Sequence, residues 1–158
     1  MRAVVQRVSE ASVSVLSSET GAMNERRVTG SIREGLCALI GVGVKDTEAD
    51  AMWMAEKIAS LRVFEDEQGK MNKSLVDTHG ALLAISQFTL YGDARKGTRP
   101  GFIDAARPEV AQPLYAQLCK LVRERGIDVQ EGVFRATMQV RIVNEGPVTL
   151  LLDSAKTF

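Results

Sequence analysis

The stretch that says most about the class of fold is Gly35-Leu36-Cys37-Ala38-Leu39-Ile40-Gly41-Val42-Gly43-Val44. All of its residues are apolar or glycine, so no position marks a side that faces solvent. A short, continuous apolar run of this kind is typical of a strand that is covered on both faces. We therefore expect a layered protein in which this strand is buried.

Strand patterns continue on both sides of this run. Residues 3–8 form a first strand, residues 12–15 alternate polar and apolar side chains, and residues 27–32 can return as the second arm of a hairpin. The polar residues 17–24 would connect the two arms. Further strands are expected at residues 127–129, 138–142 and 148–152, and residues 81–91 are expected to form a strand that runs into a loop.

Two segments have the spacing of amphipathic helices. The first follows a capping residue, Asp46 or Thr47, and the second begins near Pro108 and ends at Gly126. Pro113, inside the second, predicts a kink or a delayed start. Strands outnumber helices and lie before, between and after them. This order predicts an α+β fold, in which mostly antiparallel β-sheets form a barrel-like or layered core covered by two main helices.

Composition excludes several classes of protein. The length fits one domain over residues 1–158. Twenty basic residues balance twenty acidic ones, which argues against a strongly basic nucleic-acid module and an acidic disordered tail, although a local basic patch stays compatible. Aromatic residues make up 5% of the chain, too few for a platform that stacks many bases.

We expect a cytoplasmic protein that needs no cofactor or metal. No window approaches the about 18 apolar residues of a membrane span, and Gln6 and Arg7 interrupt the apolar core that a signal peptide would need. Cys37 and Cys119 lie far apart in apolar surroundings, which fits inert packing in a reducing compartment. With His79, the single histidine, they do not supply a zinc site of the usual spacing.

A candidate site lies at a strand end, in Ser86-Gln87-Phe88-Thr89-Leu90-Tyr91-Gly92-Asp93. Hydrogen-bonding side chains in such a place are held by a rigid scaffold. Ser86 or Thr89 would act as a nucleophile only with an adjacent base. Because His79 lies in a predicted turn, a Ser/His/Asp arrangement is poorly supported. The alternative role of these hydroxyls is to cap backbone groups.

Two further segments bear on a ligand. Asn144-Glu145-Gly146-Pro147-Val148-Thr149 either forms a plain turn or presents the carbonyls of Gly146 and Pro147 to a ligand, which can approach closely because Gly146 has no side chain. The loop at residues 95–99 has a local excess of positive charge, and it is either simply solvated or holds a phosphate backbone. Its basic residues are Arg95, Lys96 and Arg99.

Six motifs follow one another along nearly the whole chain. The first combines Val5-Gln6-Arg7-Val8 with Ala11-Ser12-Val13. The others are Gly69-Lys70-Met71-Asn72, Ser86-Gln87-Phe88-Thr89-Leu90, Gly97-Thr98-Arg99-Pro100-Gly101-Phe102, Met138-Gln139-Val140 and Asn144-Glu145-Gly146-Pro147-Val148-Thr149. In this order the chain resembles the D-aminoacyl-tRNA deacylase family. It departs from the family pattern in a longer loop at residues 17–27, in Glu145 for Asp, in Gly101 for Ser, and in a short tail at residues 153–158.

The resemblance implies a hydrolase that cleaves the ester between a D-amino acid and the 3′ end of tRNA, and that also removes glycine misattached to tRNA. It implies a homodimer with active sites at the subunit interface. In that dimer a cis peptide between Gly146 and Pro147 enters the site of the other subunit, and its carbonyl oxygens exclude an L side chain. The expected partners are therefore the aminoacylated tRNA end and a second copy of the chain.

The resemblance also implies roles for single residues. Ser86, Gln87 and Thr89 form the catalytic segment, in which the backbone N–H groups of Phe88 and Thr89 bind the aminoacyl end and the substrate's own ribose 2′-OH helps to activate water. The substrate-binding residues would be Phe88, Phe102, Ala106, Met138, Gly146 and Pro147, with weaker tRNA contacts from Arg95, Lys96 and Arg99. Two alternatives stay open: a Ser/Thr esterase with Thr89 as nucleophile, and a non-catalytic RNA-binding module.

Overall fold

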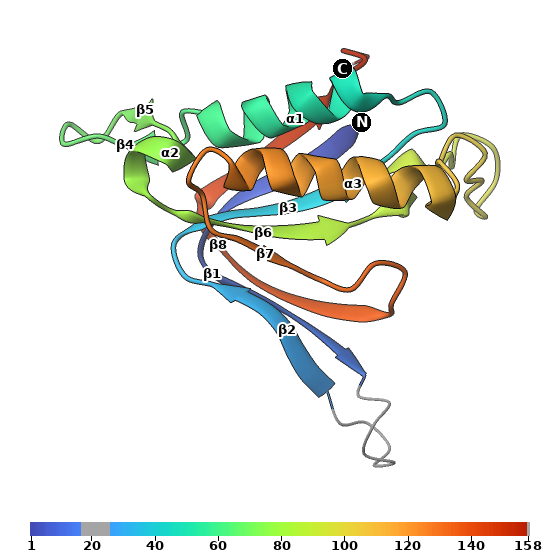
Figure 1. The fold of residues 1–158 in the computed structure, drawn as a ribbon, viewed down its shortest axis with the longest axis horizontal. Coiled ribbons are helices and arrows are strands. Elements are labelled where there is room, and N and C mark those ends of the chain that lie inside the picture. The colour runs from blue at the N-terminus through green and yellow to red at the C-terminus, as the bar shows by residue number, and fades with distance from the viewer. Residues whose placement is uncertain (17–25, 158) are drawn as a thin grey trace.

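A computed structural model describes residues 1–16 and 26–157, so most of the predicted loop at residues 17–27 lies outside the described residues. The helices and strands follow one another as β1 (Arg2–Leu16), β2 (Arg26–Ile32), β3 (Gly35–Gly41), α1 (Glu48–Ser60), β4 (Phe64–Glu65), β5 (Met71–Lys73), α2 (Leu75–Thr78), β6 (Ala81–Ser86), the 3₁₀ helix η1 (Phe88–Tyr91), α3 (Pro108–Arg123), β7 (Val129–Glu131) and β8 (Met138–Asp153). Figure 1 shows α1 and α3 lying side by side over one face of the sheet.

One six-stranded sheet forms the body of the molecule. The first half of β1 pairs with β3 and its second half with β2, while β8 pairs along its other edge, all antiparallel. Beyond β3 follow β6 and β7, each parallel to its neighbour. The sheet curls until β2 approaches β7. The approach is close at Gly30, where an added Cβ would lie 2.9 Å from the carbonyl oxygen of Glu131. These features confirm the α+β fold with a barrel-like, mostly antiparallel sheet and two main covering helices.

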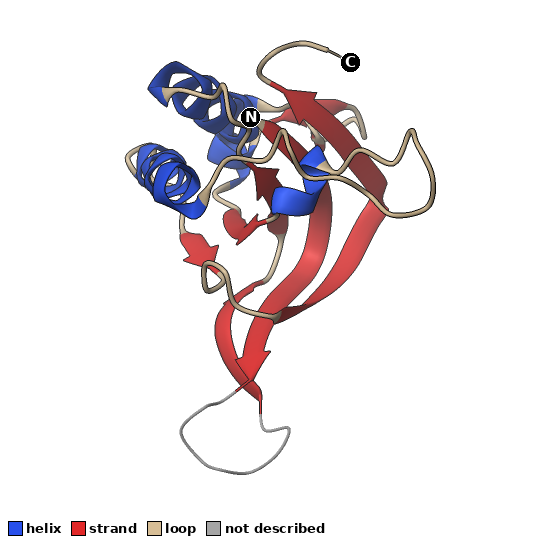
Figure 2. Ribbon diagram, turned by 90° about the vertical axis from the view of Figure 1, so that its right-hand side faces the viewer, coloured by secondary structure: helices blue, strands red, loops and turns tan. Residues whose placement is uncertain are grey.

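The apolar run that includes β3 is covered on both faces, as its sequence predicts. Leu36 and Ile40 lie in a large core with the apolar sides of α1 and α3. Cys37 points to the other side and lies in a smaller core with Leu83 and Ile85, inside the curl of the sheet. Figure 2 shows the same layering, with the helices gathered on one side and the long strands extending past them.

Some predicted boundaries differ from the structure. Residues 3–8 and 12–15 belong to the single strand β1, and residues 138–142 and 148–152 belong to the single strand β8. The predicted strand at residues 81–91 ends at Ser86 and turns into η1. Helix α3 begins at Pro108 without delay, since Pro113 inside it removes only one intrahelical N–H donor. No helix in residues 1–16 and 26–157 is long and apolar enough to cross a membrane.

Candidate active site

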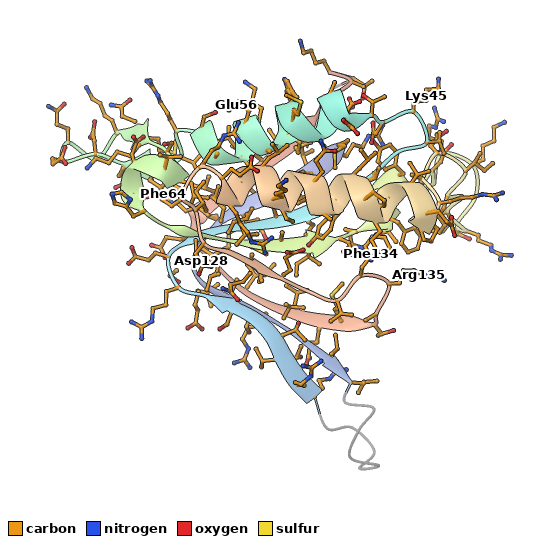
Figure 3. All side chains as sticks on the ribbon, in the orientation of Figure 1. Lys45, Glu56, Phe64, Asp128, Phe134 and Arg135 are labelled. Atoms are coloured by element: carbon orange, nitrogen blue, oxygen red, sulfur yellow. The ribbon has the colours of Figure 1, made fainter. Side chains whose placement is uncertain are left out.

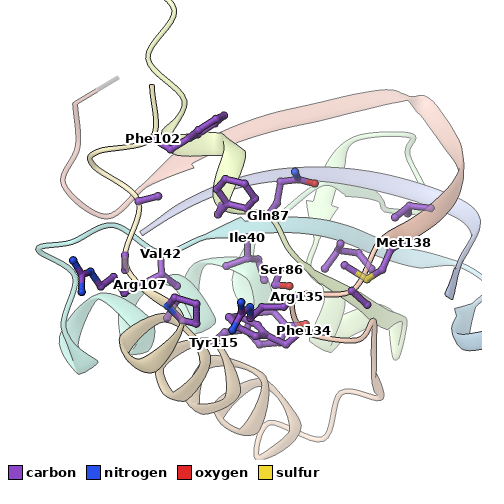
Figure 4. A pocket seen from close by; sticks show the side chains of 18 residues that line it. Ile40, Val42, Ser86, Gln87, Phe102, Arg107, Tyr115, Phe134, Arg135 and Met138 are labelled. Carbon is purple, nitrogen blue, oxygen red and sulfur yellow. The ribbon is translucent and has the colours of Figure 1, made fainter. Parts of the chain in front are cut away.

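A cavity of about 570 Å³ opens between the end of β6, η1, the first half of α3 and the loop before β8 (Figure 4). This volume is in the range of pockets that bind small molecules. Ser86 and Gln87 bring polar groups to a lining that is otherwise mainly apolar. The apolar side chains include Ile40, Val42, Ile85, Phe88, Phe102, Ala106, Phe134 and Met138.

The end of β6 places backbone donors beside this cavity. The N–H of Gln87 donates to the carbonyl of Ile40 at 2.7 Å, which is the last bond of β6 with β3, and the chain then turns into η1. The first N–H groups of a helix have no acceptor within it. Those of Phe88 and Thr89 therefore have no acceptor within η1.

Thr89 does not have the surroundings of an activated nucleophile. Its hydroxyl accepts a hydrogen bond from the side-chain amide of Gln87, a group that cannot take a proton from it. Thr89 is also absent from the cavity lining, whereas Ser86 and Gln87 belong to it. His79 is the C-cap of α2, at the opposite end of β6 from the cavity, and it does not line the cavity either.

The far end of η1 is anchored by Tyr91. Its hydroxyl donates to Oδ2 of Asp46 at 3.1 Å, and the guanidinium of Arg2 lies 4.6 Å from the centre of its ring. Burial, together with the negative charge of Asp46, raises the pKa of Tyr91 well above its ordinary value, so the hydroxyl remains a donor. The ring packs on Gly43, where an added Cβ would lie 2.7 Å from it. These contacts hold η1 against the end of β3.

Gly146 and Pro147 lie in a bulge of β8. Gln6 pairs with Thr149 and Val8 with Asn144, so residues 145–148 face only Arg7 on β1. The Gly146–Pro147 peptide is cis, the φ of Gly146 is 117°, and both residues are exposed. Neither residue lines the cavity of the same chain. One chain therefore does not bring the bulge and the end of β6 together.

The basic loop lies over a separate hollow of the surface, lined by Arg95, Lys96 and Arg99 together with Asp93, Gly101, Ile103 and Asp104. Arg95 donates from Nε and Nη2 to the two carboxylate oxygens of Asp93, at 2.9 and 2.7 Å. These hydrogen bonds lower the pKa of Asp93, and its negative charge partly offsets the positive charge of Arg95. Apart from Thr89, which lies in η1 outside the cavity lining, the sequence-predicted residues thus fall into three places: the cavity, the bulge and this hollow.

Several cavity residues were missed by sequence reasoning. Tyr115 continues the apolar face of α3, and its hydroxyl donates to the carbonyl of Ala84 at 2.9 Å, so helical spacing could have found it. Phe134 packs 6.3 Å from the Tyr115 ring, and Arg135 follows it in the same loop. Arg107 is the residue at the N-cap position of α3, and it lines another part of the rim. No periodic pattern marks the loop residues.

The cysteines and the acidic residues do not form a second reactive centre. Cys37 and Cys119 are free and buried, and burial raises the pKa of each thiol to about 12. Within the described residues, no group of three or more histidine, cysteine, aspartate or glutamate side chains is placed to hold a metal ion.

The chain is similar to known proteins over its whole length. A sequence model described as D-Tyr-tRNA(Tyr) deacylase matches residues 4–153. The D-aminoacyl-tRNA deacylases of Thermotoga petrophila and Koribacter versatilis are 52% and 56% identical to it, and each match covers 100% of both chains.

Solved structures show the same fold. A protein described as c-Myc DNA Unwinding Element Binding Protein is 39% identical, with a TM-score of 0.84 over 97% of this chain and 98% of that one. A probable eukaryotic D-amino acid tRNA deacylase, 18% identical, has a TM-score of 0.77 over 96% of this chain and 97% of that one.

The family match and the relatives together define the class of protein as a hydrolase that acts on ester bonds. Within that class, the chain belongs to the D-Tyr-tRNA(Tyr) deacylase family. This result confirms the family that the six motifs indicated.

Proposed function

We propose that this protein hydrolyses the ester of D-aminoacyl-tRNA and releases free tRNA and the D-amino acid. The observation that carries the proposal is the end of β6, where Ser86, Gln87 and Phe88 line a cavity, in a chain more than half identical to D-aminoacyl-tRNA deacylases over its full length. The proposed partner is the aminoacylated 3′ end of tRNA, and the proposed compartment is the cytoplasm.

In the proposed mechanism, a water molecule adds to the ester carbonyl carbon. The N–H groups of Phe88 and Thr89 stabilise the negative carbonyl oxygen, and the side chain of Gln87, which lines the cavity, helps to bind the aminoacyl end. The bond to the ribose oxygen then breaks, and that oxygen receives a proton that the water gave up. The lining includes no histidine, cysteine or carboxylate that could act as a base. This supports a role for the substrate's own 2′-OH in moving the proton.

Selection against L-amino acids is assigned to Gly146 and Pro147 of a second subunit. Residues 145–147 of the bulge are exposed and do not line the cavity of their own chain. Two exposed apolar side chains, Phe88 of the cavity lining at 58% and Ile103 of the neighbouring loop at 91%, support burial against a second copy. In a homodimer, the carbonyl oxygens of the bulge would occupy the space of an L side chain. Glycine has no side chain and would be accepted, so glycyl-tRNA is a second substrate.

The decisive experiment compares the hydrolysis of D-Tyr-tRNA, L-Tyr-tRNA and Gly-tRNA by the purified protein. We expect rapid loss of the D-tyrosyl and glycyl esters and an L-tyrosyl ester that stays intact. Equal hydrolysis of the D and L esters would contradict the proposal. Binding of tRNA that weakens steeply with salt, without cleavage of any ester, would instead indicate an RNA-binding module.

The role of Thr89 is tested by Thr89→Ala. If the N–H groups and the 2′-OH carry the reaction, this variant retains most of its activity, because the amide N–H of residue 89 remains. Complete loss of turnover, together with an acyl-enzyme trapped on the wild-type protein, would establish the covalent alternative.

A further inference from the structure

The rim of the cavity carries positive charge that the proposed chemistry does not use. Among the residues that line the cavity, Arg107 and Arg135 are the charged ones. Figure 4 shows Arg135 on the side formed by Phe134 and Tyr115, across the cavity from Gln87. A substrate that reaches the end of β6 would therefore extend past Arg135.

The backbone at Arg135 has a conformation that favours glycine. The N–H of Ala136 donates to the carbonyl of Val133 at 3.1 Å, which closes a turn, and Arg135 has a φ of 63° in it. Side chains with a Cβ are disfavoured at such an angle, and positive φ at a non-glycine residue clusters at functional sites. This backbone conformation fixes the direction in which the side chain of Arg135 leaves the turn, at the edge of the cavity.

The guanidinium of Arg135 is available to a ligand. Phe134 packs on Tyr115 and holds the turn against α3, while Figure 3 shows Arg135 projecting outward from the same turn. The residue is exposed, and within residues 1–16 and 26–157 its side chain has no hydrogen bond and no ion pair. No acidic residue belongs to the cavity lining. The charge of Arg135 is therefore not neutralised by the protein around the cavity.

We propose that Arg135 binds the phosphate that precedes the terminal nucleoside of the substrate. The inference rests on the proposed function, because it takes an aminoacyl-tRNA end as the occupant of the cavity. The negative charges of that end are its phosphates, and a guanidinium binds phosphate through several parallel N–H donors. The α-ammonium group of the amino acid is positive and is repelled by Arg135. The same contact thus sets the direction of the substrate, with its ester at Gln87 and its phosphate at Arg135.

The experiment uses three D-tyrosyl esters that share the same reacting bond: of adenosine, of adenosine 5′-monophosphate, and of full-length tRNA. The variant Arg135→Gly removes the guanidinium and places glycine at the positive φ. We expect its KM to rise about tenfold on the two esters that carry the phosphate, with kcat little changed and with no change of KM on the adenosine ester. Arg135→Lys keeps the charge and should recover part of the lost affinity.

Lys156→Gly is the matched control. Lys156 is also exposed and basic with a φ of 55°, and it lies in the C-terminal tail outside the cavity lining. Both glycine variants should have a Tm at or above that of the wild type, and Lys156→Gly should keep the wild-type KM on every ester. A KM of Arg135→Gly that is unchanged on all esters, raised on tRNA alone, or raised equally on the adenosine ester would overturn the inference. If the wild type cleaves none of the esters, the proposed function fails first.

Discussion

In the proposed mechanism, the residues at the end of β6 act through backbone groups and neutral side chains. Gln87 binds the Thr89 hydroxyl, and the lining contains no histidine, cysteine or carboxylate. The sequence predicts Ser86 and Gln87 from their place at a strand end, and the family resemblance adds Met138. All three line the cavity. Arg135 could not be predicted in this way, since its importance depends on a backbone angle within a turn that has no periodic pattern.

Cys37 and Cys119 should be unreactive in the folded protein. Burial raises the pKa of both thiols to about 12. A raised pKa lowers the thiolate fraction, which at about pH 8 becomes roughly one in ten thousand, compared with about a quarter for a free cysteine. Titration with a chromogenic disulfide at this pH should detect no rapid thiol in the native protein and two in guanidinium chloride. Rapid reaction of either thiol under native conditions would show that its burial is incomplete.

Gly146→Ala tests the bulge at the scale of one methyl group. The φ of 117° is unfavourable for alanine, and the added Cβ would lie 2.9 Å from the Arg7 guanidinium and from a Val148 methyl group. We expect the bulge to shift at a cost of about 1–3 kcal/mol. The kcat/KM on D-Tyr-tRNA should fall at least tenfold, and the preference for D over L should shrink. Wild-type values for both would remove Gly146 from the mechanism.

At the scale of elements, the apolar run at residues 35–44 and the two helix patterns predict what the structure contains. The predicted break in the first strand is instead a place where the pairing of β1 with β8 shifts, on both sides of Val8. Polar Ser9 and Glu10 mark this irregularity correctly, but local sequence does not distinguish a bulge from the end of a strand. The same holds for β8, where residues 145–148 interrupt the pairing without ending the strand.

The anchoring of η1 by Tyr91 leads to a prediction about rate. Tyr91→Phe removes the hydrogen bond to Asp46 and leaves the ring on Gly43, so the variant should fold with a loss of about 1 kcal/mol. Because η1 carries the N–H groups of Phe88 and Thr89, we expect kcat to fall several-fold while KM for D-Tyr-tRNA changes little.

The control is Ser74→Ala, which removes the capping hydrogen bond between Ser74 and Asp77 at α2, costs a similar free energy of about 1 kcal/mol, and changes a residue outside the cavity lining. A kcat that falls equally in both variants would mean that general loosening, and not the position of η1, limits the rate. Steady-state kinetics and urea unfolding of both variants separate the two effects.

The arrangement of the whole molecule depends on contacts between distant parts of the chain. β3 and β6 are parallel neighbours, and the segment between them crosses over through α1 and the short hairpin of β4 and β5. Which strand lies next to which is decided by these long-range pairings, so the sequence predicts the class of fold but not the strand order. The separation of cavity and bulge also appears only at this scale. Both belong to family motifs, and the order of those motifs along the chain does not show which of them lie together in space.

This separation makes subunit complementation the strongest test of the assembly. Gln87→Ala should inactivate the cavity, and Gly146→Ala should weaken the bulge, so each homodimer alone should hydrolyse D-Tyr-tRNA poorly. If the bulge of one subunit completes the cavity of the other, a mixed dimer holds one site with both parts intact and one with both parts altered. When equal amounts of the two variants are mildly unfolded together and refolded, their subunits pair at random and about half of the dimers are mixed. Because one of the two sites in each mixed dimer is intact, about a quarter of the wild-type activity should return. A mixture no more active than its parents, when size-exclusion chromatography and mass spectrometry show mixed dimers, would mean that cavity and bulge do not meet across the interface.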